Sequence, residues 1–147
     1  IADGGYSWSD CPPVFQGQSL GEVFLTPTQL YIQPILELRR QAIEIHAMAE
    51  IPVGVLPENL PRCLGDKQSV RINYETWETP RVFQWLAEAG NVSAEAMFDT
   101  FNMGVGFVVV VSPSDVEATL ASLNTQQQTA WVLGEVIDGE GEVLGLM

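Results

Sequence analysis

The feature that most constrains the fold is a block of five consecutive apolar residues, Phe107–Val111, four of which are valines. β-Branched residues favour strands, and an uninterrupted apolar run is typical of a strand that is buried on both faces. The block follows Asn102-Met-Gly-Val-Gly106, in which the two glycines allow positive φ angles or a close approach of another group. We therefore predict that Phe107–Val111 is the central strand of a mixed sheet. The turn before it is either purely structural or a place where backbone N–H groups meet a ligand.

The remaining hydrophobic patterns alternate between helical and strand spacing without a strict order. They predict one α+β domain over residues 1–147, with helices packed over the mixed β-sheet. Thr26-Pro27 is typical of a helix start, and this helix is expected to end near Arg40. Pro34 marks either a kink in that helix or its true start. Residues 1–19 are rich in Gly, Ser and Pro and are expected to form a loop, with at most one short strand.

A further helix and a hairpin are predicted in the second half of the chain. Thr79 is expected to cap a helix over residues 80–89, which Gly90 ends. Residues 129–137 and 143–146 have strand composition and flank a Gly-containing turn. These two segments are expected to pair with each other as a hairpin.

The charge balance excludes several classes of partner. Six basic against nineteen acidic residues give a formal net charge of −13. A field of this sign repels nucleic-acid phosphates and anionic lipid headgroups, so neither nucleic acid nor a membrane surface is an expected partner. No apolar run approaches the ~20 residues that span a bilayer, and no signal peptide is recognisable, so no membrane insertion is expected.

Metal and disulfide chemistry are not expected either. Cys11 and Cys63 are the only cysteines and lie too far apart for a CxxC site, while His46 is the only histidine. Two unpaired cysteines fit a reducing compartment, and the predicted location is the cytoplasm. His46 is expected to serve packing and not catalysis.

A series of short motifs runs through the chain in a recognisable order. They are Gly5-Tyr-Ser7, Leu20-Gly-Glu22, Leu25-Thr-Pro-Thr28 with Tyr31, Met48-Ala49, Leu56 with Glu58-Asn-Leu-Pro-Arg62, and Thr100-Phe-Asn-Met-Gly-Val-Gly106. In this combination the chain resembles the C-terminal domain of phosphoribosylformylglycinamidine cyclo-ligase, also called aminoimidazole ribonucleotide synthetase. The resemblance covers nearly the whole chain.

The resemblance implies an α+β fold and a role in purine biosynthesis. Enzymes of this family use ATP to close formylglycinamidine ribonucleotide to aminoimidazole ribonucleotide. Their domain for ATP and Mg lies N-terminal to the region that this chain resembles, and none of the 147 residues resembles it, so no cofactor is expected in the chain itself. The residues that the resemblance marks for residual ligand binding are Gly5, Tyr6, Ser7, Gly54, Asn59, Arg62, Asn102, Gly104 and Gly106.

Two motifs depart from the family pattern. The family's His-Ser-Asn-Gly-Tyr/Phe-Ser corresponds here to Ala2-Asp-Gly-Gly-Tyr-Ser7, and its His-Ile-Thr-Gly-Gly-Gly-Leu corresponds to Glu50-Ile-Pro-Val-Gly-Val-Leu56. Pro52 removes a backbone donor from the glycine loop, and valines disfavour positive φ. Glu50 replaces a histidine that could carry a proton, and it brings negative charge toward an anionic substrate. These changes predict a degenerate active site with no catalytic residue.

Two functions follow as expectations. The first is the C-terminal domain of a cyclo-ligase, or a relative of it, inactive as an isolated chain. The alternative is a stand-alone, non-catalytic structural or partner-binding module, a pseudoenzyme derived from that domain. A protein partner or self-association is expected at a face formed by residues 1–9 and 50–57, with Trp8, Val53 and Val55 as apolar anchors.

Overall fold

The structure, a computed structural model, describes residues 1, 4–51 and 56–146. The chain is α+β, which confirms the predicted fold class. Its helices are α1 (Leu20–Phe24), α2 (Ile32–Arg40), α3 (Leu56–Asn59), α4 (Arg81–Gly90), α5 (Ala94–Thr100) and α6 (Val116–Thr125). Its strands are β1 (Ile45–Glu50), β2 (Gln68–Ile72), β3 (Phe107–Val111), β4 (Gly134–Asp138) and β5 (Val143–Leu144).

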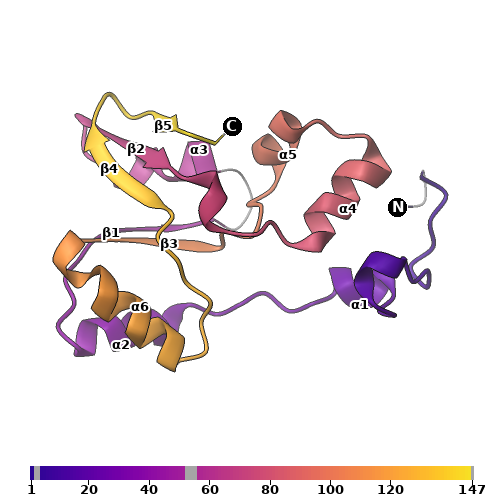
Figure 1. Ribbon diagram of the computed structural model, residues 1–147, viewed down its shortest axis with the longest axis horizontal. Coiled ribbons are helices and arrows are strands. Elements are labelled where there is room, and N and C mark those ends of the chain that lie inside the picture. Colours follow the sequence, from indigo (N-terminus) through magenta and orange to yellow (C-terminus); the bar gives the residue numbers. More distant parts are fainter. Residues whose placement is uncertain (2–3, 52–55, 147) are drawn as a thin grey trace.

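The elements fall into two halves (Figure 1). In one half, the β1–β3 pair lies between the sheet of β2, β4 and β5 on one side and helices α2 and α6 on the other. The other half consists of α1, α4 and α5 together with the N-terminal segment. An extended connection from α1 to α2 runs along one side of the molecule and joins the two halves.

Strand β3 forms where the apolar block predicts it, but its neighbours differ from the prediction. It pairs antiparallel with β1, from Glu50 opposite Phe107 to Ile45 opposite Val111. Among the described strands β1 is its only partner, and β3 is half-buried along its whole length. The prediction that β3 is a central strand is therefore wrong, and its burial is partial on both faces. Layers on the two faces of this short pair shield the apolar side chains without a second flanking strand.

The predicted C-terminal hairpin is also wrong. The second sheet has the order β4-β2-β5, so β2 separates the two segments that were expected to pair. β4 is antiparallel to β2, whereas β5 is parallel to it, with Val143 opposite Val70. The connecting turn is held at the start of β2, where Gly139 N donates to Lys67 O at 3.1 Å and Gly141 N donates to Gln68 O at 3.0 Å. These bonds carry the chain around β2 to its other edge.

The N-terminal helices differ from prediction at their boundaries. Helix α2 begins at Ile32 and contains Pro34 in its first turn, so Pro34 marks the true start and Thr26-Pro27 belongs to the extended connection. Helix α1 is not among the predicted elements, and it directly follows the segment whose Gly, Ser and Pro content predicts a loop. Its signal is present: Ser19 and Glu22 form a capping box, in which Glu22 N donates to Ser19 Oγ at 3.2 Å and Ser19 N donates to Glu22 Oε2 at 2.8 Å.

Helix α4 is capped differently from the prediction. It begins at Arg81 without a side-chain cap, and the Thr79 hydroxyl instead lies 2.9 Å from the Tyr74 hydroxyl. Gly90 belongs to the helix, which ends at Asn91 with a left-handed φ of 49°. Asparagine tolerates this conformation better than most residues, so it takes the role that was expected of Gly90.

The core consists of three clusters, of which the third, Met97, Phe98 and Met103, joins α5 to the turn before β3. The largest cluster lies between the two sheets and contains Ala49, Ile51, Leu56, Leu60, Val70, Ile72 and Val105. Trp85 of α4 anchors a second cluster with Phe15 and Leu20. In the part of the chain that the structure describes, no helix has the length and apolar character needed to cross a bilayer.

Candidate functional site

The segment before β3 forms a tight turn. Val105 N donates to Asn102 O at 2.9 Å, and the two residues between them, Met103 and Gly104, have φ angles of 51° and 100°. Positive φ at both central positions is the signature of a type I′ turn. Met103 adopts a conformation that is uncommon for a residue with a side chain, and its burial in the cluster of Met97 and Phe98 holds it there.

The Asn102 side chain fastens this turn to the end of β1. Its Oδ1 accepts a hydrogen bond from Gly104 N at 3.0 Å, and its Nδ2 donates to Ile51 O at 3.2 Å. Next to it, Trp77 Nε1 donates to Met103 O at 3.1 Å, and Ile51 N donates to Gly106 O at 2.9 Å. The amide oxygen and nitrogen of Asn102 are thus both engaged by the protein, which gives this residue a structural role.

Both glycines of the turn are required by close neighbours. A Cβ at Gly104 would lie 2.5 Å from Cδ of Pro80, the residue before α4. A Cβ at Gly106 would collide with the hydroxyl of Tyr31. The glycines let the turn approach the start of α4 and the end of the extended connection, so packing alone accounts for the absence of side chains here.

Tyr31 and Glu50 are two titratable groups that lie close together at this end of β1. The Tyr31 ring lies 5.2 Å from the Phe107 ring, centroid to centroid, and is half-buried. Burial, and secondarily the negative charge of Glu50, raise the pKa of the Tyr31 phenol above its ordinary value. His46 lies at the opposite end of β1, where its Nε2 is 2.9 Å from Ser112 Oγ. The one histidine of the chain is therefore not placed to stand in for the histidine that Glu50 replaces.

We predict that Glu50→Gln lowers the pKa of Tyr31, because the substitution removes a negative charge that disfavours the phenolate. Because the pKa of Tyr31 is raised in the folded state, its neutral phenol contributes to the free energy of unfolding, and this contribution is complete at pH values below the unfolded-state pKa. This contribution is lost as the pH rises through the folded-state pKa. The measurement is an absorbance titration at 295 nm, with Tyr31→Phe identifying the Tyr31 component. Glu44→Gln, which removes a carboxylate before the other end of β1, is the control. An unchanged Tyr31 titration in Glu50→Gln would contradict this assignment.

The other predicted site residues do not all gather around this turn. The segment that contains Gly5, Tyr6 and Ser7 lies in the half formed by α1 and α4 (Figure 1). The Tyr6 ring packs edge-on against Trp85 at 5.1 Å between centroids. Trp8 is 59% exposed and contacts the Phe24 ring. Asn102 is instead bonded to Ile51 at the end of β1, so the structure separates the first motif from the turn before β3.

The predicted site residues of the Glu58–Arg62 motif are described, whereas those of the altered loop before it are not. Asn59 is half-buried at the end of α3, and Arg62 is exposed in the short 3-10 helix that follows, Pro61–Cys63. Gly54, Val53 and Val55 lie outside the described residues.

The described ranges show neither a metal site nor an activated thiol at Cys63. In residues 1, 4–51 and 56–146, no three His, Cys, Asp or Glu side chains come together in a group that could hold a metal ion. Burial raises the pKa of the Cys63 thiol, which keeps it protonated and therefore a weak nucleophile. The second cysteine, Cys11, is exposed.

Comparison with known proteins identifies the relatives of the chain. The family model described as AIR synthase related protein, C-terminal domain, matches residues 2–146. The phosphoribosylformylglycinamidine cyclo-ligase of Synechococcus elongatus is 53% identical over 146 residues, which cover 99% of this chain and 43% of that protein. The proteins of the same name from Cyanothece sp. and Gloeothece citriformis are each 54% identical, covering 93% and 97% of this chain and 37% and 42% of their own lengths. The chain thus spans about two fifths of the length of the curated relatives it matches.

Proposed function

The chain belongs to the family of AIR synthase related proteins, C-terminal domain, and from this premise we propose that it is the C-terminal part of a phosphoribosylformylglycinamidine cyclo-ligase that has kept its fold and lost its site. Two findings carry the proposal: the family match over residues 2–146, and an identity of 53–54% to cyclo-ligases of which the chain covers about two fifths. Identity at this level over the whole chain supports a common fold and a common origin.

The arrangement at the end of β1 supports the loss of the site. Glu50 is exposed beside Tyr31, where the family motif has a histidine, and it adds negative charge to a chain of net charge −13. The Asn102 turn, which the resemblance marks for ligand binding, makes its side-chain hydrogen bonds to the protein. A carboxylate in place of an imidazole removes the group that could transfer a proton near neutral pH.

ATP and Mg would be held outside this chain. The resemblance places the nucleotide and its metal in the domain N-terminal to this region. The residues of this chain would therefore contribute only the part of the active site that binds the substrate, and a second domain would complete it.

A second candidate is a stand-alone partner-binding module, and exposed apolar side chains favour it. Leu25 is 82% and Leu30 73% exposed on the extended connection, in addition to the exposed Trp8. The described parts of the two ranges that were expected to form one contact face, 1–9 and 50–57, lie in different halves (Figure 1). In this second candidate, the partner would therefore bind at the exposed side chains of Trp8 and Leu25.

We expect the isolated chain to form no aminoimidazole ribonucleotide from formylglycinamidine ribonucleotide and ATP. A domain without its partner domain is expected to remain inactive whatever its oligomeric state.

Light scattering is expected to distinguish the two candidates. A partner-binding module should self-associate or capture a protein in a way that Trp8→Ser with Leu25→Ser abolishes. Product above the no-protein control would contradict the proposed inactivity, and a clean monomer without a partner would remove the second candidate.

A further inference from the structure

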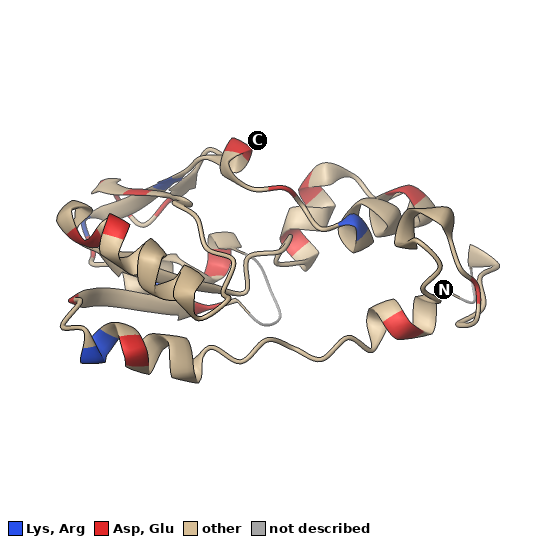
Figure 2. Ribbon diagram, turned by 60° about the horizontal axis from the view of Figure 1, so that its bottom comes forward, with Lys and Arg blue, Asp and Glu red and all other residues tan. Residues whose placement is uncertain are grey.

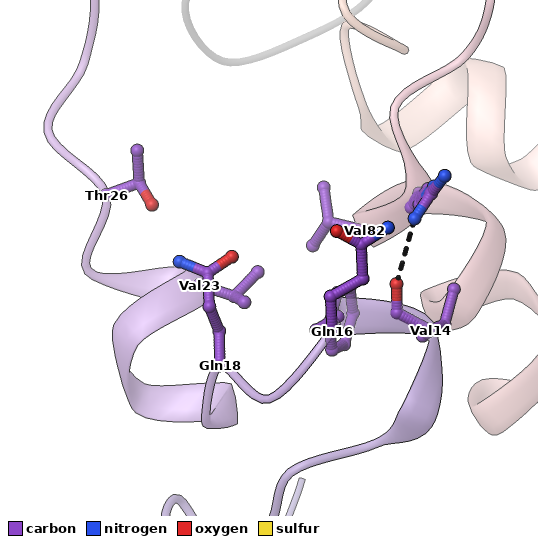
Figure 3. Close-up of a pocket in the computed structure, with 8 residues that line it drawn as sticks. Val14, Gln16, Gln18, Val23, Thr26 and Val82 are labelled. Atoms are coloured by element: carbon purple, nitrogen blue, oxygen red, sulfur yellow. Dashed lines mark hydrogen bonds between the residues drawn. The ribbon is translucent and has the colours of Figure 1, made fainter.

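A hollow in the half formed by α1 and α4 is separate from the turn at Asn102. It has a volume of about 280 Å³ and lies where α1, the start of α4 and the short helix Pro13–Phe15 meet. Figure 3 shows Gln18, Val23 and Thr26 on one side of it and Gln16 and Val82 on the other. The volume lies just below the range of sites for drug-sized ligands, so it suits a smaller molecule.

The charge at this hollow is opposite to that of the chain as a whole. Acidic positions are spread over both halves of the molecule, and basic positions are sparse (Figure 2). The lining nevertheless contains Arg81 and no carboxylate. Arg81 is also the only Lys or Arg in residues 4–25 and 80–101, which build this half. The hollow thus combines one positive charge with a lining that is otherwise neutral.

Most hydrogen-bond donors of the Arg81 guanidinium are unused among the described residues. Within the described chain it makes no ion pair, and its one hydrogen bond is a long one, from Nη1 to Val14 O at 3.4 Å. A guanidinium carries five N–H donors in a fork that matches a carboxylate. The nearby acid of α1, Glu22, is turned away into the capping box with Ser19, whose hydrogen bonds lower the pKa of its carboxyl. The protein therefore leaves the guanidinium available.

The remaining lining residues indicate which groups a ligand of this hollow carries besides the one that binds Arg81. Val23 and Val82 provide apolar surface, and the side-chain amides of Gln16 and Gln18 make no hydrogen bond among the described residues. A single cation balances a single negative charge, whereas a phosphate dianion would meet a net repulsion in a chain of this acidity. From these features we infer that the hollow is a binding site for a small organic monocarboxylate with an apolar body, whose carboxylate is held by Arg81.

The test is a titration of the isotope-labelled chain with sodium benzoate, followed by ¹H–¹⁵N correlation spectra at constant ionic strength. We expect saturable shifts at Gln16, Gln18 and Arg81. The neutral analogue benzamide and inorganic phosphate should each bind at least about 10-fold more weakly, since the first lacks the charge and the second lacks the apolar body.

Variants locate the site. Arg81→Gln should weaken benzoate binding at least about 10-fold, and Arg81→Lys should give an intermediate loss because it keeps the charge without the fork. Lys67→Gln, which removes one positive charge in the other half, should leave the affinity unchanged, and the same spectra report whether each variant is folded. The inference is overturned by non-saturable shifts, by equal binding of benzoate and phosphate, or by unchanged affinity in folded Arg81→Gln. Since it does not depend on the proposed function, either can fail alone.

Discussion

Gly104→Ala is expected to lower the free energy of unfolding by about 3 kcal/mol, against about 1 kcal/mol for Gly17→Ala. The two glycines have nearly the same φ, 100° and 96°, so an alanine is strained equally at both. They differ in their surroundings. An added Cβ at Gly17 meets nothing within 4 Å, whereas at Gly104 it lies 2.5 Å from Pro80 Cδ. The proline ring cannot move without shifting the start of α4.

Thermal unfolding of the two variants measures this difference directly. For a chain of this length, 3 kcal/mol corresponds to a fall in Tm of roughly 10 °C. The extra loss at Gly104 would show that the turn before β3 is kept for packing. Equal losses in the two variants would mean that the contact with Pro80 is not limiting, and the structural explanation of this glycine would fail.

Local sequence signals were sufficient for some elements of the fold. The apolar block at Phe107–Val111 forms a strand because β-branched residues favour extended backbone wherever the strand is placed. Pro34 marks the first turn of α2, as its fixed φ and missing N–H allow. The Ser19–Glu22 capping box is an equally local signal, and α1 was missed only because its surroundings are rich in loop-forming residues.

Strand partners could not be predicted in this way. β4 and β5 are adjacent in sequence and separated by a turn, which favours a hairpin on local grounds. The bonds that carry the chain to the other edge of β2 join Gly139 and Gly141 to Lys67 and Gln68, about seventy residues earlier. A local pattern contains no information about such contacts, and the same limit explains why β3 was expected to be central.

The candidate site shows the same division. An Asn followed two residues later by Gly indicates a tight turn, and the turn before β3 is one. The sequence does not show that the Asn102 amide binds Ile51, or that Gly106 makes room for Tyr31. Likewise, the family resemblance marks both the motif at Gly5–Ser7 and the turn at Asn102 for ligand binding, yet the structure keeps these two segments apart.

The second large effect is expected in a chimera in which residues 2–146 replace the matching part of the Synechococcus elongatus cyclo-ligase. The chimera keeps the rest of the relative's chain, so any change in its activity comes from the grafted residues, which include the altered motifs. We expect the chimera to fold and its cyclo-ligase activity to fall at least about 100-fold, because loss of a proton-transferring group alone costs 10²–10⁴. The matching region of the Cyanothece relative, grafted in the same way, controls for the junction.

The activity of this chimera before and after reversion of the altered loop tests the central claim most directly. The reverted form carries Glu50→His, Pro52→Thr, Val53→Gly and Val55→Gly, which restore the family pattern at these positions. Our account predicts little activity in the first chimera and a recovery of at least about 10-fold in the second, with both proteins equally folded. Full activity in the unreverted chimera would show that the site is intact in this chain and would contradict the claim.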